Sequence, residues 1–130
     1  MGRENPLKET DVFLPNETEI KAITHQPNVS AALVALKYIP TIAVKKGSEG
    51  AIARQNGIAT EAKALRLKVQ DTVGAGDSFD AGFIYGLLAG FNLEKTLQFA
   101  TICGSLSTCK AGGIAGQATL LEARRYLKSI

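Results

Sequence analysis

Apolar runs of strand length alternate with helical patterns in the first half of the chain, and helical patterns alone fill the second half. The strand-like runs cover 11–15 and 41–47, and helical patterns between them cover 16–24 and 31–39. An order of this kind is typical of an α/β protein whose partly parallel sheet has helices on both faces. The sequence therefore predicts a three-layer α/β sandwich.

Capping and turn residues mark where these elements begin and end. Asn16 opens the first helix with glutamates in its first turn, and either Asn28 or Ser30 can cap the second helix, which Pro40 ends. Residues 51–62 have the pattern of a β-hairpin. Its turn is Asn56-Gly57, the dipeptide most typical of a two-residue hairpin turn.

The second half predicts helices at 76–90, at 93–109 after a cap at Asn92, and at 118–130. Glycine recurs every four residues in the first of them, at Gly82, Gly86 and Gly90. Glycine inside a helix costs about 1 kcal/mol relative to alanine. Three glycines on one helix face therefore indicate that another backbone packs closely there.

The composition of the chain limits the classes of function that it can have. The chain has 130 residues, enough for one domain at 1–130, and 45% of them are hydrophobic, which suffices for a core. Its net charge is only +3, and the basic residues are scattered, so no nucleic-acid partner is expected. The longest uncharged apolar run, 81–93, is too short to span a bilayer, so no membrane partner is expected.

Cys103 and Cys109 form neither a metal pattern nor a disulfide framework, and are expected to be reduced core thiols in a cytoplasmic protein.

A turn of small residues, 74–76, lies between two aspartates and opens the helix at 76–90. The unpaired N–H groups of a first helical turn form an anion site, and glycine lets a phosphate approach the backbone. Asp77, in that first turn, could accept a hydrogen bond from an attacking hydroxyl, as phosphoryl transfer requires. An ordinary helix-terminal acid after a tight turn fits the same spacing, so both interpretations stay open at this point.

The segment DTVGAGDSFDAGF, at 71–83, resembles the signature D-T-x-G-A-G-D of the ribokinase-like, or PfkB-like, carbohydrate kinases. The resemblance implies that Asp77 is the catalytic base for a sugar hydroxyl. It implies that Asp71 and the backbone near Val73 belong to a monovalent-cation site, where K⁺ is left open as the ion. The implied anion hole for the transferred phosphate comprises Gly74, Ala75 and Gly76.

Two further segments extend the likeness. LPNETEI is similar to the N-x-x-E segment of the family, which implies that Asn16 and Glu19 help hold Mg²⁺ through water and phosphates; a helix cap with its capping-box partner fits these two residues equally well. VKKGSEGA resembles the nucleotide segment G-x-x-G, and implies contacts to ATP. The residues so implied are Lys45, Gly47, Ser48, Glu49 and Gly50.

Lys45 stands where relatives often carry a hydroxyl residue, and it either reaches a phosphate or is solvated. The loop at 110–116, with Gly112 and Gly113, resembles the family loop that completes the cation and adenine sites.

The likeness covers nearly the whole chain but only the C-terminal part of the family's doubly wound fold. The N-terminal strands, the lid and the glycines that hold the sugar are missing, which leaves a sheet edge open to self-association or to a missing N-terminal half. The expected function is ATP-dependent phosphotransfer to a hydroxyl of a small sugar or sugar derivative, with little activity from this chain alone. A nucleoside kinase of the same superfamily and a non-catalytic nucleotide-binding partner are the alternatives.

Overall fold

A computed structural model describes residues 6–65, 72, 74–109, 122–125 and 127. Helices and strands follow one another in the predicted order, and one four-stranded sheet joins the strands in the order β1-β2-β3-β4. Helical residues are also found at 122–125. The elements are η1 (Pro6–Glu9), β1 (Val12–Phe13), α1 (Glu17–Thr24), α2 (Val29–Ala35), β2 (Thr41–Lys45), η2 (Gly47–Glu49), β3 (Ala51–Gln55), β4 (Ile58–Ala62), α3 (Ala75–Leu88) and α4 (Leu93–Ser107).

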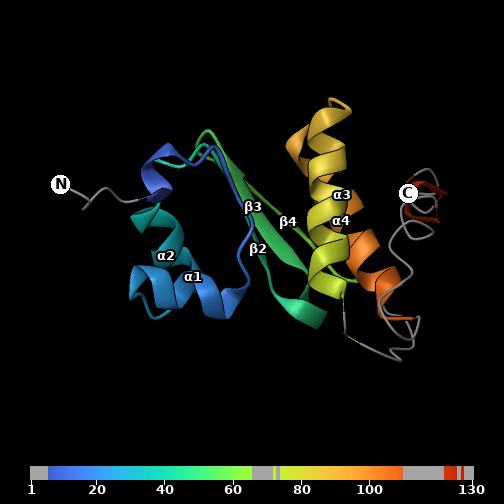
Figure 1. The fold of residues 1–130 in the computed structure, drawn as a ribbon, viewed down its shortest axis with the longest axis horizontal. Helices are drawn as coiled ribbons and strands as arrows, with labels where there is room; N and C mark the ends of the chain where they lie inside the picture. Colours follow the sequence, from blue (N-terminus) through green and yellow to red (C-terminus); the bar gives the residue numbers. More distant parts are fainter. Residues whose placement is uncertain (1–5, 66–71, 73, 110–121, 126, 128–130) are drawn as a thin grey trace.

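The sheet separates two pairs of helices, α1 with α2 and α3 with α4 (Figure 1). Strand β2 supplies side chains to both layers, because successive residues of a strand point to opposite faces. Ile42 and Val44 are fully buried against α1 and α2, whereas Ala43 is fully buried against α3 and α4. Burial of a side chain such as Ile42 contributes roughly 1.5–3 kcal/mol. The three-layer α/β prediction is confirmed.

Only β1 and β2 are parallel; β2, β3 and β4 are antiparallel, with the predicted hairpin turn at Asn56 and Gly57. Both turn residues have positive φ, 51° and 83°, as this hairpin type demands. The first strand is shorter than predicted, with two residues in place of 11–15. Pro15 has no N–H to donate, so the ladder continues past it only through the N–H of Lys45, which donates to the Pro15 carbonyl at 3.0 Å.

Helix α2 is also shorter than predicted. It begins after Asn28, whose side chain accepts from the N–H of Ala31, so Asn28 is the cap. The helix ends at Ala35, and the guanidinium of Arg54 donates to three carbonyl oxygens near and beyond that end. These carbonyls belong to Leu33, Leu36 (2.7 Å) and Ile39 (3.3 Å).

The close packing predicted for the glycines of α3 is confirmed at two positions and wrong at the third. A Cβ on Gly82 would lie 2.8 Å from Sγ of Cys103, and one on Gly86 would lie 2.8 Å from Cγ2 of Thr96, so both glycines let α4 approach. Gly90 lies beyond the helix end with φ of 80°, and a Cβ added to it would have no atom within 4 Å. Its role is a left-handed turn rather than packing.

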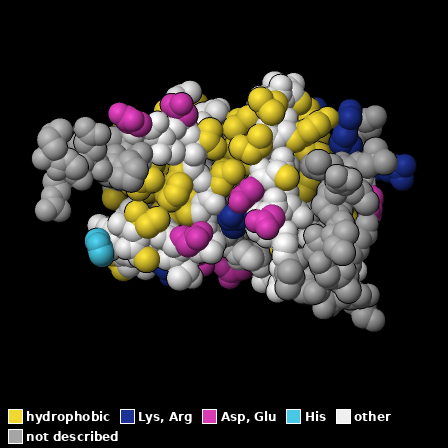
Figure 2. All heavy atoms as spheres, viewed as in Figure 1, with side chains coloured by type: hydrophobic (Ala, Val, Ile, Leu, Met, Phe, Trp, Pro, Cys, Tyr) yellow, Lys and Arg dark blue, Asp and Glu magenta, His cyan; other side chains and the backbone are white. Residues whose placement is uncertain are grey.

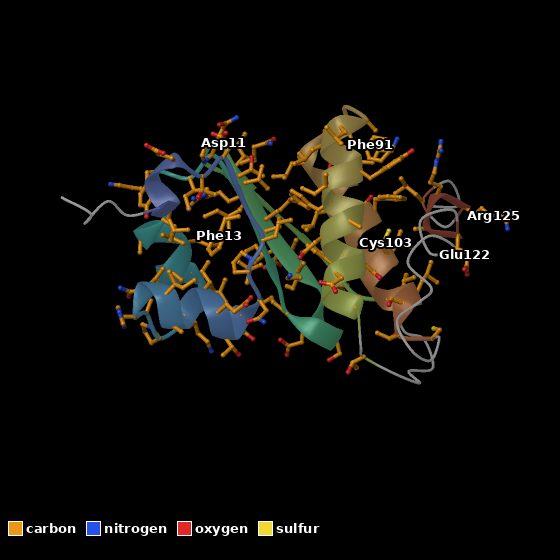
Figure 3. The ribbon with its side chains drawn as sticks, viewed as in Figure 1. Asp11, Phe13, Phe91, Cys103, Glu122 and Arg125 are labelled. Carbon is orange, nitrogen blue, oxygen red and sulfur yellow. The ribbon has the colours of Figure 1, made fainter. Side chains whose placement is uncertain are left out.

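Side chains fill the two layers beside the sheet (Figure 3). Phe13 packs against the cluster under α1 and α2, and Phe91 belongs to an aromatic group with Tyr85 and Phe99. Cys103 is a free buried thiol, and burial raises its pKa to about 12; Cys109 is free and partly exposed, which corrects the prediction of two core thiols. Among the described helices, none is long and apolar enough to cross a membrane.

Candidate functional site

Helix α3 begins at a left-handed glycine. Gly74 is the N-cap, with φ of 82° and no side chain to accept from the first turn. The N–H of Ala75 donates to the carbonyl of Thr72 at 3.2 Å, and the N–H of Ser78 donates to that of Gly74 at 2.9 Å. For the N–H groups of the intervening residues, Gly76 and Asp77, the described part of the chain shows no backbone acceptor, as is usual in a first helical turn. This turn therefore offers unpaired donors to an anion.

Asp77 lies in the first turn of α3 and is exposed. Asp80 follows three residues later on the same helix face, and it is only partly exposed. Burial raises the pKa of the Asp80 carboxyl; the charges of Asp77 and Glu19 raise it further, while the hydrogen bond and charge of Lys45 oppose the increase. The helix thus presents two carboxylates in different surroundings at one end of the sheet.

Lys45, the last residue of β2, forms an ion pair with Asp80 at 2.9 Å between Nζ and Oδ1. Its side chain is 17% exposed, so it is not the solvated lysine that the sequence left as an alternative. The ammonium also faces the glycine turn, because a Cβ on Gly76 would lie 3.8 Å from Nζ. A positive charge therefore lies beside the unpaired N–H groups of α3.

Asn16 and Glu19 lie on the other side of Lys45. Asn16 forms a parallel bridge with Lys45, which places the start of α1 beside the end of β2. The two side chains make a complete capping box: Oδ1 of Asn16 accepts from the N–H of Glu19, and Oε1 of Glu19 accepts from the N–H of Asn16, both at 2.8 Å. Among the described residues, the second carboxylate oxygen of Glu19 has no hydrogen-bond partner. On the face shown in Figure 2, acidic side chains gather around a basic one between the α1–α2 pair and α3.

The turn at Gly47–Glu49 follows β2 directly as the short helix η2. Gly47 and Gly50 both have positive φ, 60° and 96°, and the N–H of Lys46 donates to the carbonyl of Gly50 at 2.8 Å. A side chain at position 50 would collide with the carbonyl of Ala62 on β4. The glycines of the G-x-x-G segment are therefore required by the backbone.

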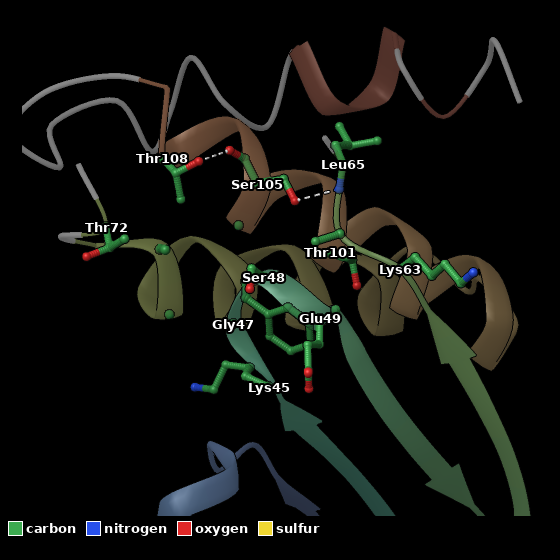
Figure 4. Close-up of a pocket in the computed structure, with 16 residues that line it drawn as sticks. Lys45, Gly47, Ser48, Glu49, Lys63, Leu65, Thr72, Thr101, Ser105 and Thr108 are labelled. Atoms are coloured by element: carbon green, nitrogen blue, oxygen red, sulfur yellow. Dashed lines mark hydrogen bonds between the residues drawn. The ribbon is translucent and has the colours of Figure 1, made fainter. Parts of the chain in front are cut away.

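A cavity of about 810 Å³ lies between this turn, the start of α3 and the side of α4 (Figure 4). Its size suits a nucleotide or another small ligand. Of the residues that the sequence singled out, those in its lining are Lys45, Gly47, Ser48, Glu49, Gly50, Ala75 and Gly76. Asp77, next in sequence to Gly76, is exposed and does not line the cavity.

Sequence reasoning missed the part of the cavity that α4 supplies. Thr101, Ser105 and Thr108 line it along one helix face, at spacings of four and three residues. The Ser105 hydroxyl accepts from the N–H of Leu65 at 3.1 Å, and the Thr108 hydroxyl donates to the Ser105 carbonyl at 2.6 Å. Thr101 is 5% exposed, and its hydroxyl has no partner among the described residues. The i, i+4, i+7 spacing of hydroxyl residues was the available signal.

Asp80 was missed as well, although its spacing from Asp77 places both on one face of α3. Four predicted residues lie outside the described part of the chain: Asp71, Val73, Gly112 and Gly113. Within the described ranges, no three His, Cys, Asp or Glu side chains are grouped as metal ligands. Mg²⁺ nevertheless fits this site, because it keeps several waters and takes one or two carboxylates together with phosphates, and Glu19 has one carboxylate oxygen that no described residue uses.

Known proteins resemble this chain over most of its length. Residues 4–120 match the pfkB family of carbohydrate kinases. The chain belongs to the pfkB carbohydrate kinase family. This family is one of phosphotransferases. This chain is 32% identical to the ribokinase of Lactococcus lactis over 120 residues, which are 92% of this chain and 39% of that enzyme.

Solved structures of the pfkB family share the fold. The Arabidopsis thaliana ribokinase complexed with ribose and ATP superimposes with a TM-score of 0.81 at 29% identity, over 90% of this chain and 41% of that one. An Escherichia coli protein assigned as ribokinase II, in complex with ATP and Mg²⁺, superimposes with a TM-score of 0.86 at 25% identity, over 95% of this chain and 41% of that one. The chain thus spans about 40% of the length of these relatives.

Proposed function

We propose that this chain is the C-terminal, nucleotide-binding and catalytic part of a kinase that transfers the γ-phosphoryl group of ATP to a hydroxyl of a small sugar or sugar derivative. The observation that carries the proposal is the start of α3. There, Gly74 opens a turn with unpaired N–H groups, and Asp77 follows in that same turn. One structural element thereby combines an anion site with a carboxylate.

Asp77 is the proposed catalytic base. Its carboxylate is exposed, so an acceptor hydroxyl can reach it. In the proposed reaction, the hydroxyl oxygen bonds to the γ-phosphorus as the bond from phosphorus to the ADP oxygen breaks, and the hydroxyl proton passes to Asp77. General bases of this kind contribute about 10²–10⁴-fold to rate. The turn of Gly74, Ala75 and Gly76, with the N–H of Gly76 as a donor, forms the proposed anion hole.

The cavity between η2 and α4 is the proposed nucleotide site. The Gly47–Gly50 turn lines one side, with Ser48 and Glu49 at its tip, and Lys45 lies where the turn meets α3. The unpartnered hydroxyl of Thr101 supports a polar ligand in this cavity, because buried hydroxyls are normally hydrogen-bonded. Bound ATP supplies the phosphoryl group. Glu19, with Asn16 fixing its orientation, is placed to hold Mg²⁺ through water.

The first test is nucleotide binding by the purified 130-residue chain. Calorimetry with ADP and Mg²⁺ is expected to show binding that is tighter than that of adenosine. Transfer is expected to be slight with the chain alone, because the chain spans only about 40% of the length of its relatives. A folded chain that does not bind ADP would contradict the proposal.

Transfer itself is tested in a chimera in which this chain replaces the matched part of the Lactococcus ribokinase. Nucleotide binding by the chimera establishes that it is folded, and ribose, other sugars and nucleosides are then offered as acceptors. Asp77→Asn is expected to reduce transfer at least 100-fold, roughly the lower end for a general base, with nucleotide affinity retained. Glu94→Gln is the matched control, because Glu94 is an exposed acid in the first turn of α4. Equal transfer by both variants would remove Asp77 from the mechanism.

A further inference from the structure

Lys45 occupies an electrostatically unfavourable place. The first turn of α3 carries the positive end of the helix dipole, which repels a cation. Lysine also has a flexible four-carbon stem, and fixing such a side chain costs up to about 2 kcal/mol of rotamer entropy. Yet its Nζ lies 3.8 Å from the position of a Cβ on Gly76, and its side chain is 17% exposed. Another group must therefore hold the ammonium at this turn.

Asp80 is that group. Its Oδ1 accepts from Nζ of Lys45 at 2.9 Å, in an ion pair that is partly shielded from water. Two further carboxylates lie near enough for their charges to act on Asp80: Asp77 from α3 and Glu19 from α1. Only Asp80 is paired with the ammonium in the described structure. The Lys45 ammonium therefore lies at Asp80, about one helical turn beyond Asp77, the proposed base.

We infer that Asp80 is a positioning residue, which holds the Lys45 ammonium beside the Gly74–Gly76 turn as a contact for nucleotide phosphate and keeps it from pairing with Asp77. The inference rests on the proposed function, since it assigns a phosphate to that turn. The inference means that Asp80 affects the affinity of the protein for phosphate only through Lys45. Asp77 then remains free to accept a proton.

The free protein supplies the first readout. In ¹H–¹⁵N spectra of lysine side chains, the Lys45 ammonium is expected to give a signal protected from solvent exchange, assigned by its loss in Lys45→Met. Asp80→Asn is expected to abolish that protection, and Asp80→Glu to restore it in part. Glu61→Gln is the matched control, because it removes one exposed carboxylate from β4. A protected Lys45 signal in Asp80→Asn would overturn the inference.

Calorimetry with ADP and with adenosine, in the presence of Mg²⁺, supplies the second readout. Asp80→Asn is expected to weaken ADP about tenfold, the low end for a hydrogen bond between charged groups, and to leave adenosine unchanged. In the Lys45→Met background, Asp80→Asn should have no further effect on ADP. Equal or tighter ADP binding by Asp80→Asn would show that Asp80 competes with phosphate for Lys45, and would overturn the inference. If Asp80→Asn weakens ADP binding just as much in the Lys45→Met background, Asp80 acts on the nucleotide without Lys45, which also overturns the inference.

The same data separate this inference from the proposed function. Wild-type protein that binds ADP no better than adenosine contradicts the proposed function, and the inference with it, whatever the spectra show. Wild-type protein that prefers ADP, with Asp80→Asn unchanged in that preference, contradicts the inference alone. Preference for ADP that is lost in Asp80→Asn and in Lys45→Met, and kept in Glu61→Gln, supports both.

Discussion

Gly50 and Ala62 approach so closely that a Cβ on Gly50 would lie 2.0 Å from the carbonyl oxygen of Ala62. The contact joins the end of η2 to the end of β4. Gly50 and Lys63, which lie at this junction, both line the cavity. Because φ at Gly50 is also 96°, a side chain there is excluded both by space and by backbone conformation. The cavity therefore depends on this glycine.

Gly50→Ala is expected to lower the free energy of unfolding by more than about 2 kcal/mol, since overpacking adds roughly 1–3 kcal/mol to the cost of positive φ. Urea denaturation measures the change. Gly57→Ala is the matched control, because Gly57 has a positive φ of 83° but open space around a Cβ, and should lose only about 1–2 kcal/mol. Equal losses in the two variants would mean that the contact with Ala62 relaxes without cost.

Replacing Arg54 is expected to destabilise the junction between α2 and β2. Its guanidinium donates to carbonyls of Leu33, Leu36 and Ile39, and burial lowers its pKa. Arg54→Met removes hydrogen bonds donated by a charged group, which should cost roughly 1.5–3 kcal/mol in urea denaturation. Lys37→Met, at an exposed position nearby, should change stability by less than about 0.5 kcal/mol. Matching losses in the two variants would contradict the capping role.

Asp80→Asn is expected to raise stability at neutral pH while it weakens phosphate binding. Burial raises the pKa of Asp80 above its ordinary 3.8, so the folded state favours the protonated carboxyl. The favourable contribution is complete below pH 3.8 and is lost as pH rises through the raised pKa. The midpoint temperature of Asp80→Asn should therefore equal that of the wild type in acid and exceed it at about pH 7. A variant less stable than the wild type at neutral pH would contradict the sign of this linkage.

Local rules could predict the helix and strand order and the caps of α1 and α4, and they limited the cap of α2 to two residues, because capping and turn chemistry are carried by adjacent residues. Asn16, Asn28 and Asn92 all cap helices, and Asn56-Gly57 forms the hairpin turn. Element ends were predicted less well, since they depend on contacts across the fold. The early end of α2 coincides with capping by Arg54, which lies 18 residues beyond Leu36 along the chain.

The residues of the candidate site also fall into those that the sequence alone could identify and those that it could not. Its glycine turns and Asp77 could be found from the sequence, because their spacing is local. The Lys45–Asp80 pair joins residues 35 positions apart, and only the packing of β2 against α3 brings them together. The α4 wall of the cavity was missed because hydroxyl residues on a buried helix face also satisfy ordinary packing. Long-range juxtaposition is thus the information that the structure adds.

Thr101→Val is expected to have opposite effects on the free and the ligand-bound protein. Thr101 is 5% exposed, and its hydroxyl has no partner among the described residues, so replacing it by a methyl group of similar size removes an unpaired buried polar group. Stability of the free chain should rise by about 1–3 kcal/mol, the cost of such a group. If the cavity holds the nucleotide, as proposed, ADP affinity should fall because a hydrogen-bond partner is lost.

Thermal unfolding with and without ADP measures both effects. Thr108→Val is the control: the Thr108 hydroxyl is already paired with Ser105, so this variant should lower the stability of the free chain. A Thr101→Val variant that is destabilised without ADP would mean that the hydroxyl is satisfied in solution.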